Sequence, residues 1–149
     1  MITNEEFEDL MRLQKHFILN KLDLPNVGSK AEPFLIASDS TRDYFALDAD
    51  RKSSISLTKI KLQERYTTAH VMMVRVEIDC RPHMFPDGSK SSRNHIHVFN
   101  EKFGNTVYDL SSAFKEFFTD ISNFETTFYD FCRMCNISTN NIDIQGVVL

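Results

Sequence analysis

The clearest alternation of apolar and polar residues runs from Ala69 to Cys80, in the middle of the chain. Val74, Val76 and Ile78 occupy every second position, and polar residues such as Glu77 stand between them. Because a strand turns successive side chains to opposite faces, this pattern predicts a strand with one core face and one polar face. Two shorter apolar runs, at 33–38 and 44–48, are separated by polar turn formers and predict an antiparallel hairpin.

Helical patterns stand at both ends of the chain. Thr3 and Glu6 form a capping box, and the apolar stripe behind it predicts a helix from Asn4 to about Asn20. Two further stripes predict two C-terminal helices, the second of which starts at a capping box of Ser122 and Glu125. The stripes consist of Leu110, Phe114, Phe117, Phe118 and Ile121, and of Phe124, Phe128, Phe131, Cys132 and Cys135.

Together these elements predict an α+β fold, in which a mainly antiparallel sheet carries one N-terminal helix and two C-terminal helices packed on one face. The weakly alternating tail, 142–149, is expected to add an edge strand or a docked extension. The chain of 149 residues suits a single domain over 1–149, which buries roughly 70% of the surface of the unfolded chain.

Charge and cysteine usage narrow the class of protein. A net charge of −4 and a pI near 5.7 argue against direct binding to nucleic acid, which requires an excess of Lys and Arg on one face. Three cysteines, no export signal and no long apolar run indicate the reducing cytoplasm and no membrane segment.

The strongest candidate chemistry follows the long central strand. Cys80 and His83 stand three positions apart, and an 11-residue connection leads from His83 to His95 and His97. The last two share one face of a predicted strand, so their imidazoles can bind one ion. Imidazole nitrogen and thiolate sulfur are ligands that tetrahedral zinc prefers. We therefore predict a structural zinc ion bound by Cys80, His83, His95 and His97.

The fourth ligand has competitors. Cys80 points with the core residues of its strand, whereas Asp79 points to the opposite face. Asp87 lies beside the turn glycine of the loop, and Cys132 and Cys135 form a second cysteine pair. That pair lies on the phenylalanine stripe of its helix, where buried free cysteines are common, so we interpret it as core packing first.

An open zinc site is the alternative. Three protein ligands beside a carboxylate, from Glu77, Asp79 or Asp87, could activate water for hydrolysis. The sequence lacks the His-Glu-x-x-His motif of metalloproteases and the His-x-Glu with Pro-Cys-x-x-Cys motif of deaminases. The absence of a recognisable catalytic set favours a non-enzymatic protein over a zinc-dependent hydrolase or nuclease-like enzyme.

Several short motifs resemble an uncharacterised family of small bacterial and phage proteins. The resemblance covers most of the chain. Its residues are Gln63-Glu64-Arg65-Tyr66, Pro82-His83, Pro86-Asp87-Gly88, His95-Ile96-His97-Val98 and a helix end with Phe131, Cys132, Cys135 and Asn136.

The size, the acidity and the candidate metal site also resemble phage-encoded anti-CRISPR proteins that inhibit type II-A Cas9. That resemblance implies an inhibitor in the cytoplasm of a bacterial host. Such an inhibitor would bind Cas9 or its guide-RNA complex and block DNA loading or cleavage, and zinc would hold its binding surface in shape. A partner protein in a toxin-antitoxin or regulatory pair is a further alternative.

Overall fold

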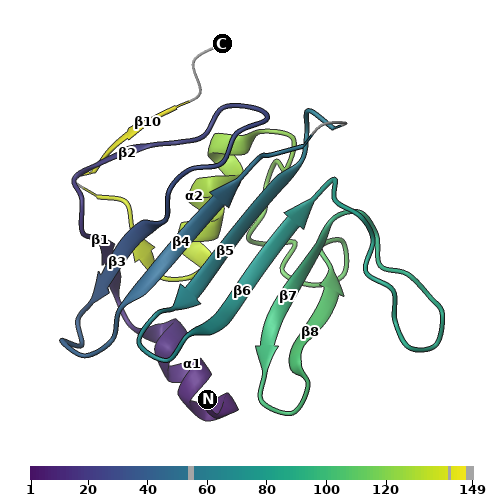
Figure 1. Cartoon of the computed structure of the whole chain (residues 1–149), viewed down its shortest axis with the longest axis horizontal. Helices are drawn as coiled ribbons and strands as arrows, with labels where there is room; N and C mark the ends of the chain where they lie inside the picture. The colour runs from purple at the N-terminus through teal and green to yellow at the C-terminus, as the bar shows by residue number, and fades with distance from the viewer. Residues whose placement is uncertain (54–55, 141, 147–149) are drawn as a thin grey trace.

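The alternating segment of the sequence becomes one strand of a large sheet. We describe residues 1–53, 56–140 and 142–146 of a computed structural model of the protein. The elements are α1 Asn4–Arg12, β1 Lys15–Phe17, β2 Lys21–Asp23, β3 Phe34–Ser38, β4 Phe45–Asp50, β5 Ile60–Tyr66, β6 Val71–Ile78, β7 His95–Asn100, β8 Gly104–Asp109, α2 Phe124–Met134, β9 Ile137–Ser138 and β10 Asp143–Gln145. Eight strands form the sheet in the order β8-β7-β6-β5-β4-β3-β1-β9 (Figure 1). Only β1 and β9 pair in parallel within it.

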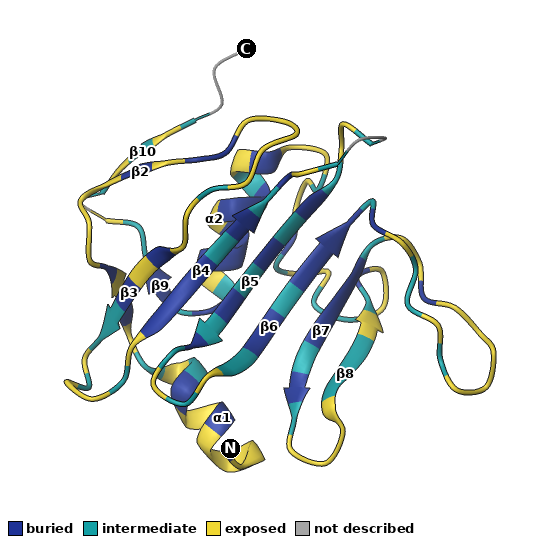
Figure 2. Ribbon diagram, viewed as in Figure 1, coloured by how far each residue is buried: buried dark blue, intermediate teal, exposed yellow. Residues whose placement is uncertain are grey.

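The sheet has one covered face and one open face. Helix α2 lies behind β4 and β5 in Figure 1, and its Phe128 packs against Phe17 and Phe34 with ring centroids 6.2 to 6.3 Å apart. Along β5, buried residues alternate with partly exposed ones (Figure 2). Apolar side chains therefore fill the covered face, and polar side chains stand on the open face.

A bulge divides β6 into two parts. The pairing register shifts between Glu64 and Arg65 of β5, so Met73 and Val74 are both buried. Beyond the bulge the predicted alternation holds, with Val76 in the core and Glu77 on the other face. The C-terminal half of β6, which pairs with β7, is therefore regular.

The predicted hairpin is confirmed as the antiparallel pair β3 and β4. The first helix begins at the predicted capping box of Thr3 and Glu6. Its predicted end near Asn20 was wrong, because the backbone leaves helical geometry at Leu13, with ψ of 135°. Lys15 and Phe17 then alternate into the core as β1.

The first of the two predicted C-terminal helices does not form, and that prediction was wrong. Residues 110–121 form a series of turns, and Phe114 takes the left-handed conformation with φ of 64°, which an α-helix does not tolerate. Thr119 turns towards α2 and donates from its backbone N and its Oγ1 to Asp130 Oδ2, at 3.1 and 3.2 Å. The fold is α+β with one C-terminal helix.

Helix α2 starts one residue later than predicted, because Asn123 and not Ser122 accepts the capping hydrogen bond, from Thr126 N at 2.9 Å. In the tail, β10 pairs in parallel with β2, and residues 147–149 lie outside the described part of the chain. Neither described helix has the length and hydropathy that a membrane crossing needs.

A buried ion pair joins both helices to the sheet. Lys15 Nζ lies 4.0 Å from Glu64 Oε2, and neither side chain is exposed. Lys15 donates to the carbonyl oxygens of Met11, Leu13 and Cys135 near the C-terminal ends of α1 and α2, where the helix dipole favours a cation. Glu64 accepts no hydrogen bond from the described residues. Burial raises the pKa of Glu64 to about 7, although the charge of Lys15 acts in the opposite direction.

Replacing Glu64 with Gln is expected to change how stability depends on pH. Because the pKa of Glu64 is about 7 in the folded chain and 4.5 in the unfolded chain, the protonated carboxyl stabilises the fold. This contribution is complete below pH 4.5 and is lost as the pH rises through about 7. The free energy of unfolding should therefore fall by about 3 kcal/mol more in the native protein than in Glu64→Gln over that range. Urea unfolding at several pH values measures the difference, and parallel profiles would contradict it.

Candidate metal centre

The register between β6 and β7 places four polar residues together on the open face. Glu77 pairs with His95, and Arg75 pairs with His97. Between the two histidines, Ile96 turns to the other face and is fully buried in the core. The prediction that His95 and His97 share one strand face is therefore confirmed.

Two histidine nitrogens converge on a single carboxylate oxygen. Nε2 of His95 and Nε2 of His97 each lie 2.8 Å from Oε2 of Glu77. Their ligand atoms all lie within 4.8 Å of one another. The exposed fractions are only 8% for Glu77, 1% for His95 and 5% for His97, so the cluster is shielded from solvent on a face that is otherwise polar and open.

The far side of each imidazole is held by an acceptor. His95 Nδ1 lies 3.0 Å from the carbonyl oxygen of Ser92, and His97 Nδ1 lies 3.1 Å from Oδ1 of Asn105. The carbonyl oxygen of Ser92 and an ionised Glu77 both only accept, so a His95 ring with a single proton donates to one of them and turns a lone pair towards the other. A second proton on the ring, or a cation between the three ligand atoms, removes the repulsion.

The arrangement fits a divalent metal ion. Histidine ligands in metal sites usually donate their second nitrogen to a carbonyl or carboxylate, as both rings do at this site. Tetrahedral zinc with ligand distances of about 2.0 Å holds its ligand atoms about 3.3 Å apart. The nitrogens would need to move away from Glu77 by about 0.5 Å to accept such an ion. The buried Glu77, His95 and His97 cluster could therefore bind a metal.

The second oxygen of Glu77 faces two cations. Lys61 Nζ lies 3.5 Å and Arg75 Nε lies 3.9 Å from Oε1. Burial alone would raise the pKa of Glu77, but the hydrogen bonds from His97 and His95 and the charge of Arg75 outweigh it and lower the pKa to about 2. Glu77 is therefore an anion, with one oxygen for a metal and one for its cationic neighbours.

A cavity of about 530 Å³ opens beside the cluster and is bounded by the loop that joins β6 to β7. Its wall contains the three cluster residues, His83 and the cations Arg75, Arg81 and Lys90. We call it the histidine cavity. The ring of His83 lies 5.8 Å from that of His97, so the structure brings this predicted ligand to the site, although it is not part of the three-atom cluster.

The structure does not bring Cys80 to the cluster. Its side chain is buried, and its Sγ lies 3.6 Å from the carbonyl oxygen of Ile60 and 3.4 Å from that of Ile78. Burial raises the pKa of the Cys80 thiol, which favours the protonated form over a ligand thiolate.

The other proposed fourth ligands also lie elsewhere. Asp79 takes a left-handed conformation, with φ of 51°, and its carboxylate binds Ser56, Thr58 and Arg93. Asp87 is exposed in the loop and accepts hydrogen bonds from Ser89. Cys132 and Cys135 lie in the core, and burial raises the pKa of both thiols.

Comparison with known proteins assigns a family without assigning an activity. A family model described as a family of unknown function, DUF6978, matches residues 2–137. The chain belongs to DUF6978. No curated protein and no solved structure matches it.

Sequence reasoning did not assign Glu77 as a ligand, although it named Glu77 as a carboxylate close to the zinc. The signal that identifies it is strand parity, because Glu77 shares the face of β6 that carries Arg75, opposite the face of Val76. Spacing along the chain favoured Cys80 instead, because its separation from His83 is typical of zinc ligands. In this DUF6978 chain, face direction indicates which carboxylate lies beside His95 and His97 better than sequence distance does.

Single substitutions should distinguish a metal site that includes Cys80 from one formed by Glu77, His95 and His97. We expect His95→Ala to weaken the binding of divalent cobalt, a spectroscopic substitute for zinc, by more than about 100-fold. Cys80→Ser should leave cobalt affinity unchanged, because Sγ is buried against the carbonyl oxygens of Ile60 and Ile78 and is not part of the cluster. Competition titration monitored by visible absorption measures both. Sulfur-to-cobalt charge-transfer absorption that disappears in Cys80→Ser would contradict the Glu77, His95 and His97 set.

Asn105→Ala tests the support of His97. Removing Oδ1 leaves Nδ1 of His97 without its acceptor, and the loss of such outer partners typically weakens metal binding by about 10-fold to 100-fold. The melting temperature of the metal-free protein should change little, because Asn105 is only partly buried on β8. Equal cobalt affinity in Asn105→Ala and the native protein would show that the hydrogen bond does not orient the ring.

Proposed function

We propose that the protein binds zinc through His95, His97 and Glu77, and that this zinc centre is of the open, hydrolytic type. The observation that carries the proposal is the approach of both Nε2 atoms to one oxygen of Glu77, 2.8 Å from each, while Nδ1 of His95 is already bound to a carbonyl oxygen. Two imidazoles and a carboxylate suit zinc in geometry and in ligand type.

Three protein ligands are typical of catalytic zinc, because the fourth position remains for water or substrate. Bound zinc would act as a Lewis acid and lower the pKa of its water to about 7. Residues of the chain would balance the charges around the metal. Glu77 stays ionised between the metal position and the two cations Lys61 and Arg75, and the histidine cavity admits a substrate beside them.

A structural zinc is the second candidate, and the position of His83 favours it. His83 lies in the loop, with its ring 5.8 Å from that of His97, and a movement of the loop would bring in a fourth nitrogen and close the site. A closed site would hold the loop in shape as a binding surface, which is the role for zinc that the resemblance to Cas9 inhibitors implies. Inhibition of Cas9 stays a prediction, and co-migration with Cas9 or its guide-RNA complex in size-exclusion chromatography tests it.

His83→Ala distinguishes the two candidates. In an open site we expect zinc affinity and the melting temperature of the zinc-loaded protein to remain close to the native values. Zinc affinity should fall by more than about 100-fold in His95→Ala. In a closed site, both His83→Ala and His95→Ala would weaken zinc binding and lower the melting temperature. Competition titration and calorimetry supply the measurements.

Hydrolysis should depend on the metal and on the carboxylate. Adding zinc to metal-free protein is expected to produce hydrolysis of activated esters such as p-nitrophenyl acetate and bis(p-nitrophenyl) phosphate. The rate should be lost in Glu77→Gln and should fall in acid, because zinc needs deprotonated imidazole. A protein that holds one zinc ion and hydrolyses neither ester would favour the structural candidate.

A further inference from the structure

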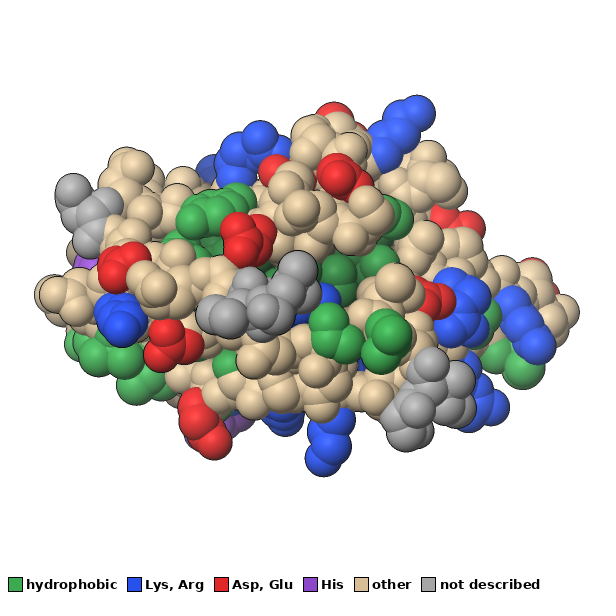
Figure 3. Space-filling view, turned by 90° about the horizontal axis from the view of Figure 1, so that it is seen from above, with side chains coloured by type: hydrophobic (Ala, Val, Ile, Leu, Met, Phe, Trp, Pro, Cys, Tyr) green, Lys and Arg blue, Asp and Glu red, His purple; other side chains and the backbone are tan. Residues whose placement is uncertain are grey.

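The histidine cavity carries a strong positive charge. Arg75, Arg81 and Lys90 line it, and Glu77 is the only carboxylate among the described residues of its wall. Three positive side chains against one carboxylate leave a formal charge of +2, and a bound divalent metal would raise it further. Lys and Arg side chains also gather at the right-hand end of the molecule in Figure 3, the end from which the loop 81–93 projects in Figure 1.

Cations around a metal position need an explanation. Like charges at distances of 4 to 6 Å repel, more strongly where solvent is partly excluded. A site that served only to hold a metal would be stabilised by carboxylates, not by arginine and lysine. An anionic ligand that binds the metal and the surrounding cations together removes this repulsion.

Arg75 has hydrogen-bond donors to spare for such a ligand. Within the described part of the chain, its guanidinium makes one hydrogen bond, a long one of 3.5 Å from Nη1 to Gln63 Oε1, while its buried Nε faces Glu77 Oε1 at 3.9 Å. About a third of its side chain is exposed. Arg75 thus pairs loosely with its neighbours at the edge of the metal position.

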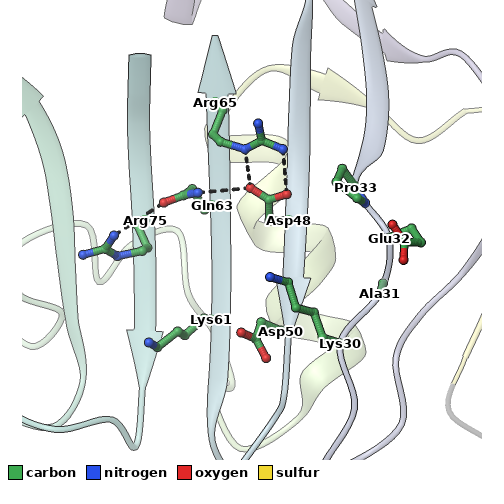
Figure 4. Close-up of a pocket in the computed structure, with 10 residues that line it drawn as sticks. All are labelled: Lys30, Ala31, Glu32, Pro33, Asp48, Asp50, Lys61, Gln63, Arg65 and Arg75. Atoms are coloured by element: carbon green, nitrogen blue, oxygen red, sulfur yellow. Dashed lines mark hydrogen bonds and ion pairs between the residues drawn. The ribbon is translucent and has the colours of Figure 1, made fainter. Parts of the chain in front are cut away.

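A second cavity continues from Arg75 across the open face. This strand cavity, of about 620 Å³, is shown in Figure 4, where Arg75 and Lys61 lie at its left edge. Its wall also contains Gln63, the carboxylates Glu32, Asp48 and Asp50, and the cations Lys30 and Arg65. Arg65 donates to Asp48, so groups of both charges stand side by side in this wall. Such a mixed polar surface suits a neutral, hydroxyl-bearing body next to an anionic group in the histidine cavity.

We propose that the histidine cavity binds the phosphate group of a small phosphate ester, whose polar body extends over Lys61 into the strand cavity. A phosphate monoester carries nearly two negative charges and three acceptor oxygens, which Arg75, Arg81 and the metal can share. A carboxylate, with one charge and two oxygens, satisfies fewer of these groups. The inference rests on the proposed metal centre and specifies the ligand class of that site.

Cobalt-loaded protein tests the inference directly, because the visible spectrum of cobalt reports its ligands. The probes are inorganic phosphate, glycerol 3-phosphate and acetate. We expect a saturable spectral change with both phosphate compounds, tighter binding of glycerol 3-phosphate, and a markedly weaker response to acetate. Arg75→Gln and Arg81→Gln should each weaken glycerol 3-phosphate binding by about 10-fold or more while cobalt affinity stays the same or rises.

Arg42→Gln is the matched control, because Arg42 is exposed in the turn between β3 and β4 and lines neither cavity. It should bind glycerol 3-phosphate like the native protein. If cobalt binds and neither phosphate compound changes its spectrum at about 10 mM, the inference is overturned and the metal centre stands. Acetate binding as tight as phosphate, or unchanged affinity in Arg75→Gln and Arg81→Gln, overturns it too. Failure of cobalt to bind overturns both proposals.

Discussion

The pairing of β6 with β7 is the constraint on which the site depends. Its register sets Glu77 beside His95 and Arg75 beside His97, and strand alternation turns all four to the open face. A shift by one residue would send the histidines into the core and Ile96 into the polar face. The fully buried Ile96 and Val76 oppose such a shift, so hydrophobic packing on one face holds the polar geometry on the other.

Charge then divides the site into two halves that meet at Glu77. Oε2 faces two imidazole nitrogens, and Oε1 faces Lys61 and Arg75. The hydrogen bond from His97, the charge of Arg75 and the hydrogen bond from His95 keep Glu77 ionised despite its burial. Lys61 and Arg75 also place positive charge next to the position of a metal. Glu77 is therefore shared by the proposed metal position and the proposed phosphate site. Lys61 and Arg75, which face its Oε1, can also contact an incoming anion.

The sequence predicted those features that local periodicity and capping determine. The capping box of α1, the hairpin of β3 and β4, and the shared face of His95 and His97 all follow from residues close together in the chain. The missing helix over 110–121 does not, because Thr119 is fixed by Asp130 of α2, and this tertiary hydrogen bond competes with helical propensity.

The candidate metal ligands also divide into those that local sequence predicts and those that depend on tertiary structure. His83 reaches the site through a loop that the sequence could only describe as long, and Glu77 becomes a ligand candidate only when the register of β6 against β7 is known. Cys80 met the spacing rule for zinc ligands, but its thiol is buried against the carbonyl oxygens of Ile60 and Ile78. Spacing predicts which residues lie near one another, and face direction decides which of them meet.

The central claim is that a metal binds between Glu77, His95 and His97. Metal analysis of tag-free protein together with zinc X-ray absorption tests it most directly. The account predicts about one equivalent of zinc, with a shell of nitrogen and oxygen atoms at about 2.0 to 2.1 Å and no sulfur. Less than about 0.2 equivalents of zinc, or a sulfur ligand at about 2.3 Å, would contradict it.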